Sequence, residues 1–208
     1  MGTPTGQDIN AALGVEHVDG RSLRRSRNRT AVIAALLDII REGNLCPSAS
    51  EIADRAGVSH RSIFRYFDDL DDLRQTAIDQ AFSEARPLAV IPDIGTGSLE
   101  ERIAAIVDAR ITLYESVDGT MQLARTRAAA MPSIDEGIAE IAQAFRVQVA
   151  QHFAEELAPK DEAERDLLVD AVVVLTSYDS YTIHRRLFGS GVERIRSAWS
   201  CGLRALLR

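Results

Sequence analysis

Residues 48–67, SASEIADRAGVSHRSIFRYF, decide the fold of the N-terminal part of this chain. Ser48 and Glu51 have the spacing of a capping box, in which the two side chains accept hydrogen bonds from free backbone amides at a helix start. Gly57 ends this first short helix, because glycine adopts a left-handed backbone without steric cost. Ser59 then offers a cap for a second short helix. The stretch therefore predicts two short helices joined by a tight turn, a helix-turn-helix.

The second short helix has two faces of different character. Ile63 and Phe67 are four residues apart and form its inward face. At about 100° per residue, Arg61 and Arg65 lie on the opposite face. Arginine in such a position suits the major groove of DNA, because its guanidinium group pairs with the edge of guanine. A solvated helix face without a partner is the simpler alternative for this pair.

The charge of the chain is distributed unevenly. The whole chain has a formal net charge of −7 and a pI near 5.2, which taken alone argues against a nucleic-acid binder. Residues 21–67 nevertheless hold nine arginines and four acids, a net charge of +5. Five of these arginines lie near the start of the first predicted helix, where positive charge opposes the helix dipole at a cost of about 0.3 kcal/mol or more each. Phosphate groups would offset that cost, so we expect this basic block to face nucleic acid.

The stretch 48–67, continued to Leu73, resembles the DNA-binding domain of the TetR family of transcriptional regulators. The resemblance is specific over residues 23–73, and beyond them only the number of helices, their lengths and the total size agree. It implies that the first three helices bind DNA, while the remainder binds a ligand and forms a dimer. Two residues depart from the family pattern, because Phe64 replaces the usual tyrosine and Leu70 replaces a common lysine.

The resemblance and the charge pattern together name the expected DNA contacts. By position in the family pattern, the groove-facing side chains are Ser50, His60, Arg61, Ser62, Phe64 and Arg65, and the phosphate contacts are Ser48, Ser59 and Tyr66. The charge argument adds Arg24, Arg25 and Arg27 to the phosphate contacts. The acids on either side of Leu70 are expected to cap the next helix and to weaken affinity for the DNA backbone nearby.

The hydrophobic pattern is helical from residue 21 onward, so we expect an all-α fold of about nine helices without a sheet. Residues 1–20 are expected to form a flexible tail, residues 21–72 the helix-turn-helix domain, and residues 73–208 the ligand-binding and dimerisation domain. The first helix is expected over residues 23–42, ended by Gly43. Two later helices are expected to start at the capping boxes Ser98/Glu101 and Ser133/Glu136. Between these starts we expect a turn over residues 117–120 and a helix that Pro132 closes. The last two helices are expected over residues 161–188 and 192–207.

The C-terminal two thirds suggest a dimer and a ligand site. Apart from Asp170, residues 167–175 are apolar and cover every side of their helix, so we expect this helix to be buried all round, with one face against a second copy of the chain. The last helix adds a broad face made of Ile195, Ala198, Trp199, Gly202, Leu203 and Leu206, which predicts a homodimer through residues 161–207. Candidate ligand contacts are Tyr114, Met121, Arg125, Phe145 and Tyr178, although core packing is the commoner role for such residues. Arg125 or Arg110 is a candidate partner for an acidic ligand, and a solvated arginine is the alternative.

The sequence holds no arrangement typical of an enzyme. The four histidines lack metal-ligand spacing, Cys46 and Cys201 lie far apart, and Glu100 stands where a nucleotide-binding loop after Gly95 would need glycine. We therefore expect no catalytic activity, metal or cofactor. Neither a membrane span nor a secretory signal is evident, which predicts a cytoplasmic protein.

These features predict a ligand-responsive transcriptional regulator. In this interpretation the protein is a repressor that binds a palindromic DNA operator as a homodimer and is released by a small-molecule effector. The alternative is a non-enzymatic ligand-sensing or protein-interaction module whose helix-turn-helix recognises no specific operator.

Overall fold

The structure is a computed structural model that describes residues 20–128 and 132–208. Over these residues every regular element is helical, which confirms the expected all-α fold. The chain divides into two compact units between Ala77 and Ile78. The expected tail lies outside the described residues, except for Gly20, which begins the first helix. None of the described helices combines the length and the apolar character needed to span a membrane.

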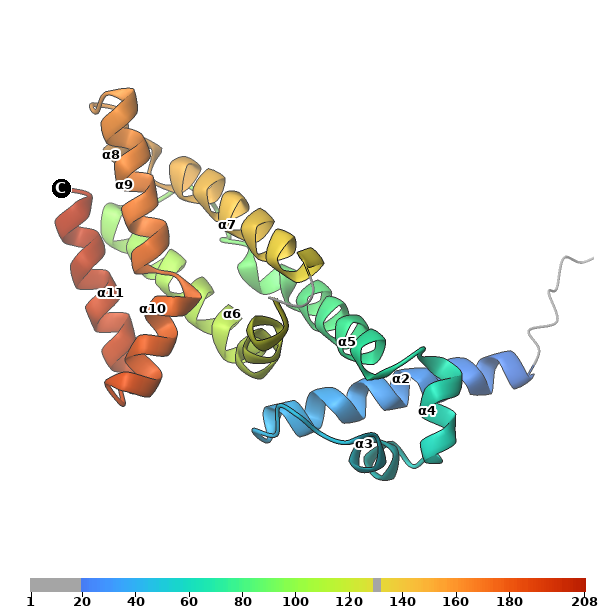
Figure 1. The fold of residues 1–208 in the computed structure, drawn as a ribbon. Coiled ribbons are helices and arrows are strands. Elements are labelled where there is room, and N and C mark those ends of the chain that lie inside the picture. Colours follow the sequence, from blue (N-terminus) through green and yellow to red (C-terminus); the bar gives the residue numbers. More distant parts are fainter. Residues whose placement is uncertain (1–19, 129–131) are drawn as a thin grey trace, which may run out of the picture. The chain divides into compact units, whose positions relative to one another are not determined.

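The N-terminal unit contains α2 (Gly20–Arg41), α3 (Ala49–Ala56), α4 (His60–Tyr66) and the first half of α5 (Leu70–Ala85) (Figure 1). Both turn glycines expected from the sequence have left-handed backbones, with φ of +98° at Gly43 and +66° at Gly57. The buried side chains of this unit include Val32, Ile33, Leu36, Ile40, Ile52, Ala53, Ile63, Phe67 and Leu73. The predicted helix-turn-helix geometry is therefore present.

The C-terminal unit is built around α6 (Leu99–Ala128), which packs against α7 (Pro132–His152) and α11 (Val192–Leu206). The remaining elements are the second half of α5, the 3₁₀ turn η1 (Arg86–Ala89), α8 (Ala154–Leu157), α9 (Glu162–Leu175), α10 (Tyr178–Thr182) and the π-helical turn η2 (Ile183–Leu187). In Figure 1, α9 and α11 run side by side.

Two expected boundaries are wrong around α6. The predicted turn over residues 117–120 is absent, because α6 continues through it with Val117 and Met121 buried in the core. Packing of these side chains outweighs the cost of about 1 kcal/mol for the helical Gly119. Pro132 begins α7 instead of closing a helix, since proline is favourable at a first helical position. Ser133 consequently lies inside α7 and not before its start, while residues 129–131 lie outside the described part of the chain.

The other expected capping box, at Ser98, is confirmed. The Glu101 amide donates to Ser98 Oγ at 3.4 Å, and the Ser98 amide donates to Glu101 Oε2 at 2.8 Å. Both bonds satisfy backbone amides that the first turn of α6 leaves free.

The expected single helix over residues 161–188 is interrupted. α9 ends at Leu175 and α10 begins after Ser177, whose Oγ accepts a bond of 3.1 Å from the Ser180 amide. The buried carbonyl of Thr176 accepts a hydrogen bond of 2.9 Å from the Tyr114 hydroxyl. The polar groups at the break are therefore satisfied, which removes the usual penalty for interrupting a buried helix.

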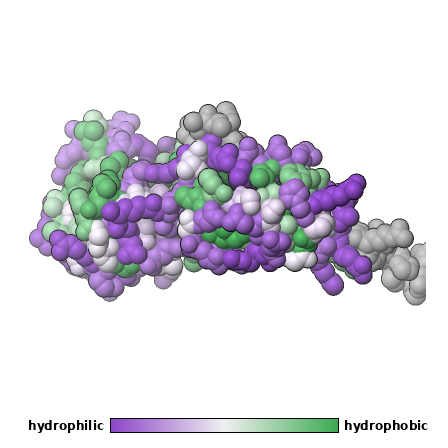
Figure 2. Space-filling model, turned by 60° about the horizontal axis from the view of Figure 1, so that its bottom comes forward, coloured by the Kyte–Doolittle hydropathy of each residue, from purple (hydrophilic) through white to green (hydrophobic). Residues whose placement is uncertain are grey.

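The helix expected to be buried all round has one exposed face in the single chain. Val169 and Val172 are buried, whereas Leu167 is 70% exposed and Val174 is 67% exposed. Three residues assigned to the dimer face of the last helix, Ile195, Trp199 and Leu203, are instead fully buried in the core of their own unit. Figure 2 shows apolar surface over the C-terminal helices, at the left of the view. The exposed large apolar residues of this part of the chain include Leu167 and Val174 on α9, Ile183 and Leu187 in η2, and Phe188 directly after it.

A buried polar cluster joins α6 to the end of α7. Arg102 is 2% exposed, donates to the Gly97 carbonyl at 2.6 Å and forms ion pairs with Glu155 and Glu156. His152 is 1% exposed; its Nδ1 accepts from the Gly95 amide at 3.1 Å, which assigns the proton to Nε2, where it bonds to the Arg102 carbonyl at 2.8 Å. The cluster therefore requires a neutral imidazole.

This cluster predicts a pH-dependent stability. Burial lowers the pKa of His152 below its ordinary value of 6.5, so the unfolded chain takes up a proton at a higher pH than the native chain. The histidine contribution to stability is then present above about pH 6.5 and is lost as the pH falls. In urea unfolding between about pH 7.5 and 5.5, the free energy of unfolding should fall less steeply for His152→Gln than for the wild type. His60→Gln, at an exposed histidine, is the control, and equal slopes for wild type and H152Q would contradict the prediction.

Candidate DNA-binding surface and ligand cavity

The outward face of α4 carries the side chains expected in a DNA groove. Ile63 and Phe67 are buried and fix the orientation of the helix, so that Arg61 and Arg65 are exposed. The remaining groove-facing candidates are His60 and Phe64, which are exposed with ring centroids 5.1 Å apart, Ser62, which is half-buried, and Ser50 on α3, which is exposed. The exposed face of α4 therefore carries two cations and an aromatic pair, while Ile63 and Phe67 hold the opposite side in the core.

Tyr66 links α4 to α2 through its hydroxyl. That oxygen accepts hydrogen bonds from Asn28 Nδ2 at 3.2 Å and from Arg65 Nη2 at 2.7 Å, and the Arg65 guanidinium lies 5.0 Å from the ring centroid. The Asn28 bond is the largest cause of a lowered pKa for Tyr66, and the Arg65 bond adds to it. Both bonds use the hydroxyl as an acceptor, so its own proton remains available to donate to a phosphate.

The two serines expected at phosphates take different roles. Ser48 forms the predicted capping box, since its Oγ accepts from the Glu51 amide at 3.2 Å and its amide donates to Glu51 Oε2 at 2.8 Å. Ser59 stands at the cap position of α4, but its side chain does not cap the helix. The predicted N-cap position of Ser59 is thus confirmed, but its Oγ lies 2.8 Å from Ser62 Oγ and the two hydroxyls pair with each other.

Basic side chains at the start of α2 have no acidic counterpart in the first turn of that helix. Arg24, Arg25 and Arg27 are exposed, and the Arg29 guanidinium lies 4.9 Å from the Phe67 ring centroid. This end of α2 combines the positive helix terminus with several arginines, which is favourable for binding anions.

The acids at the start of α5 cap their own helix. Asp69 Oδ1 accepts from the amides of Asp71 and Asp72 at 2.8 Å each, and Asp72 Oδ2 accepts from the Asp68 amide at 3.0 Å. Asp69 and Asp72 therefore have the capping role expected from the sequence, while the carboxylate of Asp71 pairs with Arg74.

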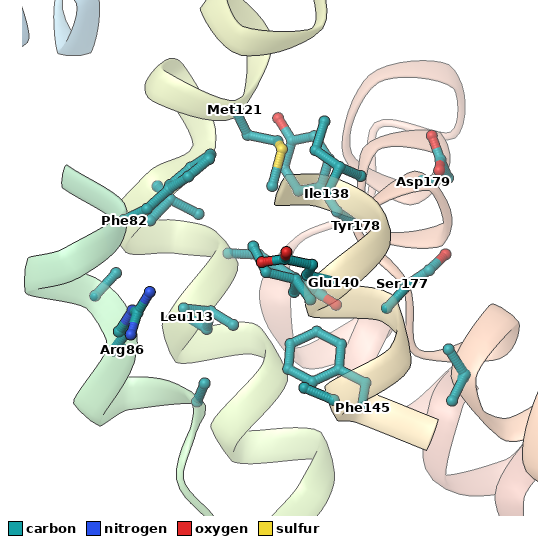
Figure 3. A pocket seen from close by; sticks show the side chains of 18 of the residues that line it. Phe82, Arg86, Leu113, Met121, Ile138, Glu140, Phe145, Ser177, Tyr178 and Asp179 are labelled. Carbon is teal, nitrogen blue, oxygen red and sulfur yellow. The ribbon is translucent and has the colours of Figure 1, made fainter. Parts of the chain in front are cut away.

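The C-terminal unit contains a cavity of about 480 Å³ walled by α5, α6, α7 and the junction of α9 with α10. All five candidate ligand contacts line it, namely Tyr114, Met121, Arg125, Phe145 and Tyr178. Figure 3 shows Phe82 and Arg86 on one side of the space, facing Glu140 and Phe145 of α7. The lining residues that the sequence did not indicate are Phe82, Ala85, Arg86, Ala89, Leu113, Val117, Ile138, Glu140, Ile141, Ala142, Ala144, Val173, Ser177 and Asp179.

Two buried tyrosines give the cavity wall a fixed shape. Tyr114 donates to the Thr176 carbonyl, and Tyr178 donates to Asp118 Oδ1 at 2.6 Å. Burial raises the pKa of Tyr114 to about 12, while burial and the bond to Asp118 raise the pKa of Tyr178. Both phenols are therefore neutral at physiological pH and act as hydrogen-bond donors within the wall.

The two arginines considered for an acidic ligand differ in their partners. Arg125 forms a bidentate ion pair with Asp179 and lies 4.9 Å from the Tyr178 ring centroid, so its charge is compensated. Arg110 is 1% exposed, donates to Gln148 Oε1 at 2.7 Å and holds its guanidinium carbon 3.5 Å from the Phe145 ring centroid. Burial lowers the pKa of Arg110 to about 10, which still leaves it cationic at neutral pH.

The described residues contain no cluster of three or more histidine, cysteine or acidic side chains placed to hold a metal ion. Cys46 and Cys201 are both exposed and unbonded to each other.

Comparison with known proteins supports the fold through structure alone. No protein-family model matches the sequence, and no curated protein matches it either. A tetR-family transcriptional regulator from Streptomyces coelicolor superposes with a TM-score of 0.70 at 18% identity, covering 87% of this chain and 80% of that chain. A transcriptional regulator from Rhodococcus sp. Rha1 gives a TM-score of 0.67 at 18% identity, covering 86% of this chain and 95% of that chain. The chain therefore has the fold of the TetR-family transcriptional regulators.

Proposed function

We propose that this protein is a transcriptional regulator that binds a DNA operator through α4 and α2 and responds to a small molecule bound in the C-terminal unit. The observation that carries the proposal is the exposed Arg61 and Arg65 pair on a helix whose opposite face is anchored in a core. The regulators with the same fold support it. In this proposal the protein is a repressor, and the effector releases it from DNA.

The DNA contacts divide into those that read sequence and those that fix position. In this proposal Arg61 and Arg65 pair with base edges in a major groove, and Phe64 adds an apolar contact of the kind that thymine methyl groups accept. Arg24, Arg25 and Arg27, with the hydroxyls of Ser48 and Tyr66, are suited to phosphates. The described base-reading surface is one short helix, so a single copy reads few base pairs.

A homodimer would double that reading surface. Leu167 and Val174 lie seven residues apart, on one face of α9, and both are more than two-thirds exposed in the single chain. Phe188, also exposed, adds apolar surface next to η2. Covering this surface with a second copy would bury it, and a two-fold dimer would present two recognition helices to half-sites roughly 34 Å apart.

The cavity supplies the expected means of regulation. Its volume of about 480 Å³ lies in the range of small-molecule sites, and its wall combines apolar and aromatic side chains with a few polar groups. An effector releases DNA when it favours a conformation in which the recognition helices no longer match their half-sites. Shifting such an equilibrium from 99:1 to 1:99 requires about 5.5 kcal/mol of differential binding.

The alternative is a ligand-sensing or protein-interaction module that recognises no specific operator. The deciding experiment is a mobility-shift assay with the DNA upstream of the protein's own gene, in the presence of excess competitor DNA. A specific shift supports the regulator, and its absence favours the alternative.

Replacing Arg61 by alanine should weaken specific operator binding by about 1–3 kcal/mol, because a bidentate contact to a base is lost. Binding to competitor DNA should change much less, since it depends on the phosphates. Arg41→Ala is the matched control, because Arg41 is exposed but pairs with Asp38 at the other end of α2. Equal losses for specific and competitor DNA would show that Arg61 does not read bases.

Replacing Arg24, Arg25 and Arg27 together by alanine should flatten the salt dependence of operator affinity. Each lost phosphate contact is expected to reduce the slope of log K against log salt by about one. Fluorescence anisotropy over a salt series measures this slope, and Arg55→Ala, which removes an exposed arginine paired with Glu42, serves as the control. A slope unchanged in the triple variant would contradict a phosphate role for the start of α2.

Replacing Val174 by glutamate should weaken the homodimer by about tenfold or more, because two buried valines are exchanged for two desolvated carboxylates at the interface. Analytical ultracentrifugation over a concentration series measures the dissociation constant. Val90→Glu is the control, since Val90 is 63% exposed but lies outside α9 and α11. A wild-type monomer at micromolar concentration, or equal effects of the two variants, would contradict this interface.

A further inference from the structure

Arg110 and Gln148 extend two walls of the ligand cavity by one helical turn. On α6, Arg110 precedes the lining residues Leu113 and Tyr114 by three and four positions, which places it on the same face of the helix. On α7, Gln148 follows the lining residue Phe145 by three positions. The Nη2 group of Arg110 bonds to Gln148 between these two helices at 2.7 Å, and the pair lies next to the cavity without lining it.

Arg110 has no counter-charge within the described part of the chain. Among the residues that the structure describes, no carboxylate pairs with Arg110, and its Nη1 group has no hydrogen-bond partner. The other buried arginine of this unit, Arg102, pairs with Glu155 and Glu156. Burial of a charged group without a counter-charge is unfavourable, and the penalty is relieved when an anion reaches it.

Two neighbours connect this guanidinium group to the cavity. The Phe145 ring packs against the guanidinium at 3.5 Å and also lines the cavity. Gln148 Nε2 donates to the carbonyl of Ala89, another lining residue, at 2.8 Å. Gln148 therefore holds Arg110 from the side, and a ligand in the cavity would reach the guanidinium group if Phe145 changed its rotamer.

We propose that the cavity binds an amphipathic carboxylate, whose apolar body packs among the lining side chains and whose carboxylate pairs with Arg110. The charges along the lining favour an anion once Arg110 is included, because Arg125 is paired with Asp179 and the lining holds one further cation, Arg86, and one further acid, Glu140. This inference names the class of effector and rests on the proposed function in taking the cavity as the effector site.

The test compares matched acids and amides. Octanoate, decanoate and naphthoate are each titrated by calorimetry into the full chain at neutral pH, next to the neutral primary amide of the same body. A hydrogen bond between two charged groups is stronger than one between a charged and a neutral group. The best-fitting acid should therefore bind about tenfold or more tightly than its amide. Arg110→Met keeps an apolar stem like that of arginine but removes the charge. This variant should abolish the preference for the acid and leave the affinity for the amide within about twofold of the wild type.

Two further variants control the result. Arg86→Met removes a cavity arginine that the proposal does not pair with the carboxylate, and it should keep the preference for the acid. Arg110→Lys retains the charge without the fork of donors and should keep part of the preference, which also guards against misfolding of R110M. Equal binding of acid and amide by the wild type, binding of neither member of any pair, or a preference that persists in R110M overturns the proposal.

The outcome is separable from that of the proposed function. The titrations contain no DNA, so a missing preference for acids leaves a specific mobility shift of the unliganded protein intact. Conversely, an absent mobility shift contradicts operator binding, but a preference for acids that depends on Arg110 still supports the carboxylate site. A carboxylate that binds through Arg110 should also release DNA from the wild type at lower concentration than from R110M.

Discussion

Tyr114 connects the cavity wall of the C-terminal unit to the break between α9 and α10, and the shape of the cavity depends on this connection. Its ring lies within 5.6–6.3 Å of the centroids of Tyr178, Tyr181 and Trp199, and its hydroxyl donates to the Thr176 carbonyl between α9 and α10. A buried phenol without a partner is unfavourable, and so is a buried carbonyl without one. The single bond between them satisfies both groups, and it joins the cavity wall to the helices that carry the exposed apolar surface.

The N-terminal unit was predictable because its signals are local. Ser48 and Glu51 act over three residues, and the left-handed backbone at Gly57 is a property of that one residue. The C-terminal boundaries were less predictable, because Gly119, Pro132 and Ser177 each permit more than one local structure. Long-range packing decided between the possibilities, and a single sequence does not display that packing.

The cavity was predictable only through its polar and polarizable residues. Tyr114 and Tyr178 stood out as polar groups inside apolar helices, and both line the space. Apolar lining residues such as Phe82 and Ile138 carry no signal that separates them from ordinary core residues. The burial of Arg110 could not be predicted either. Whether an arginine is solvated, paired or buried alone depends on partners from another helix.

Trp199 is a natural fluorescent probe close to the cavity. It is the only tryptophan of the chain, it is fully buried, and its indole donates to Ser180 Oγ at 3.0 Å, while its ring centroid lies 6.3 Å from that of Tyr114. Indole emission depends on the polarity around the ring and on its hydrogen bond. The protein thus carries an intrinsic optical reporter one side chain away from its cavity, and occupancy of that space can be followed without attaching a label.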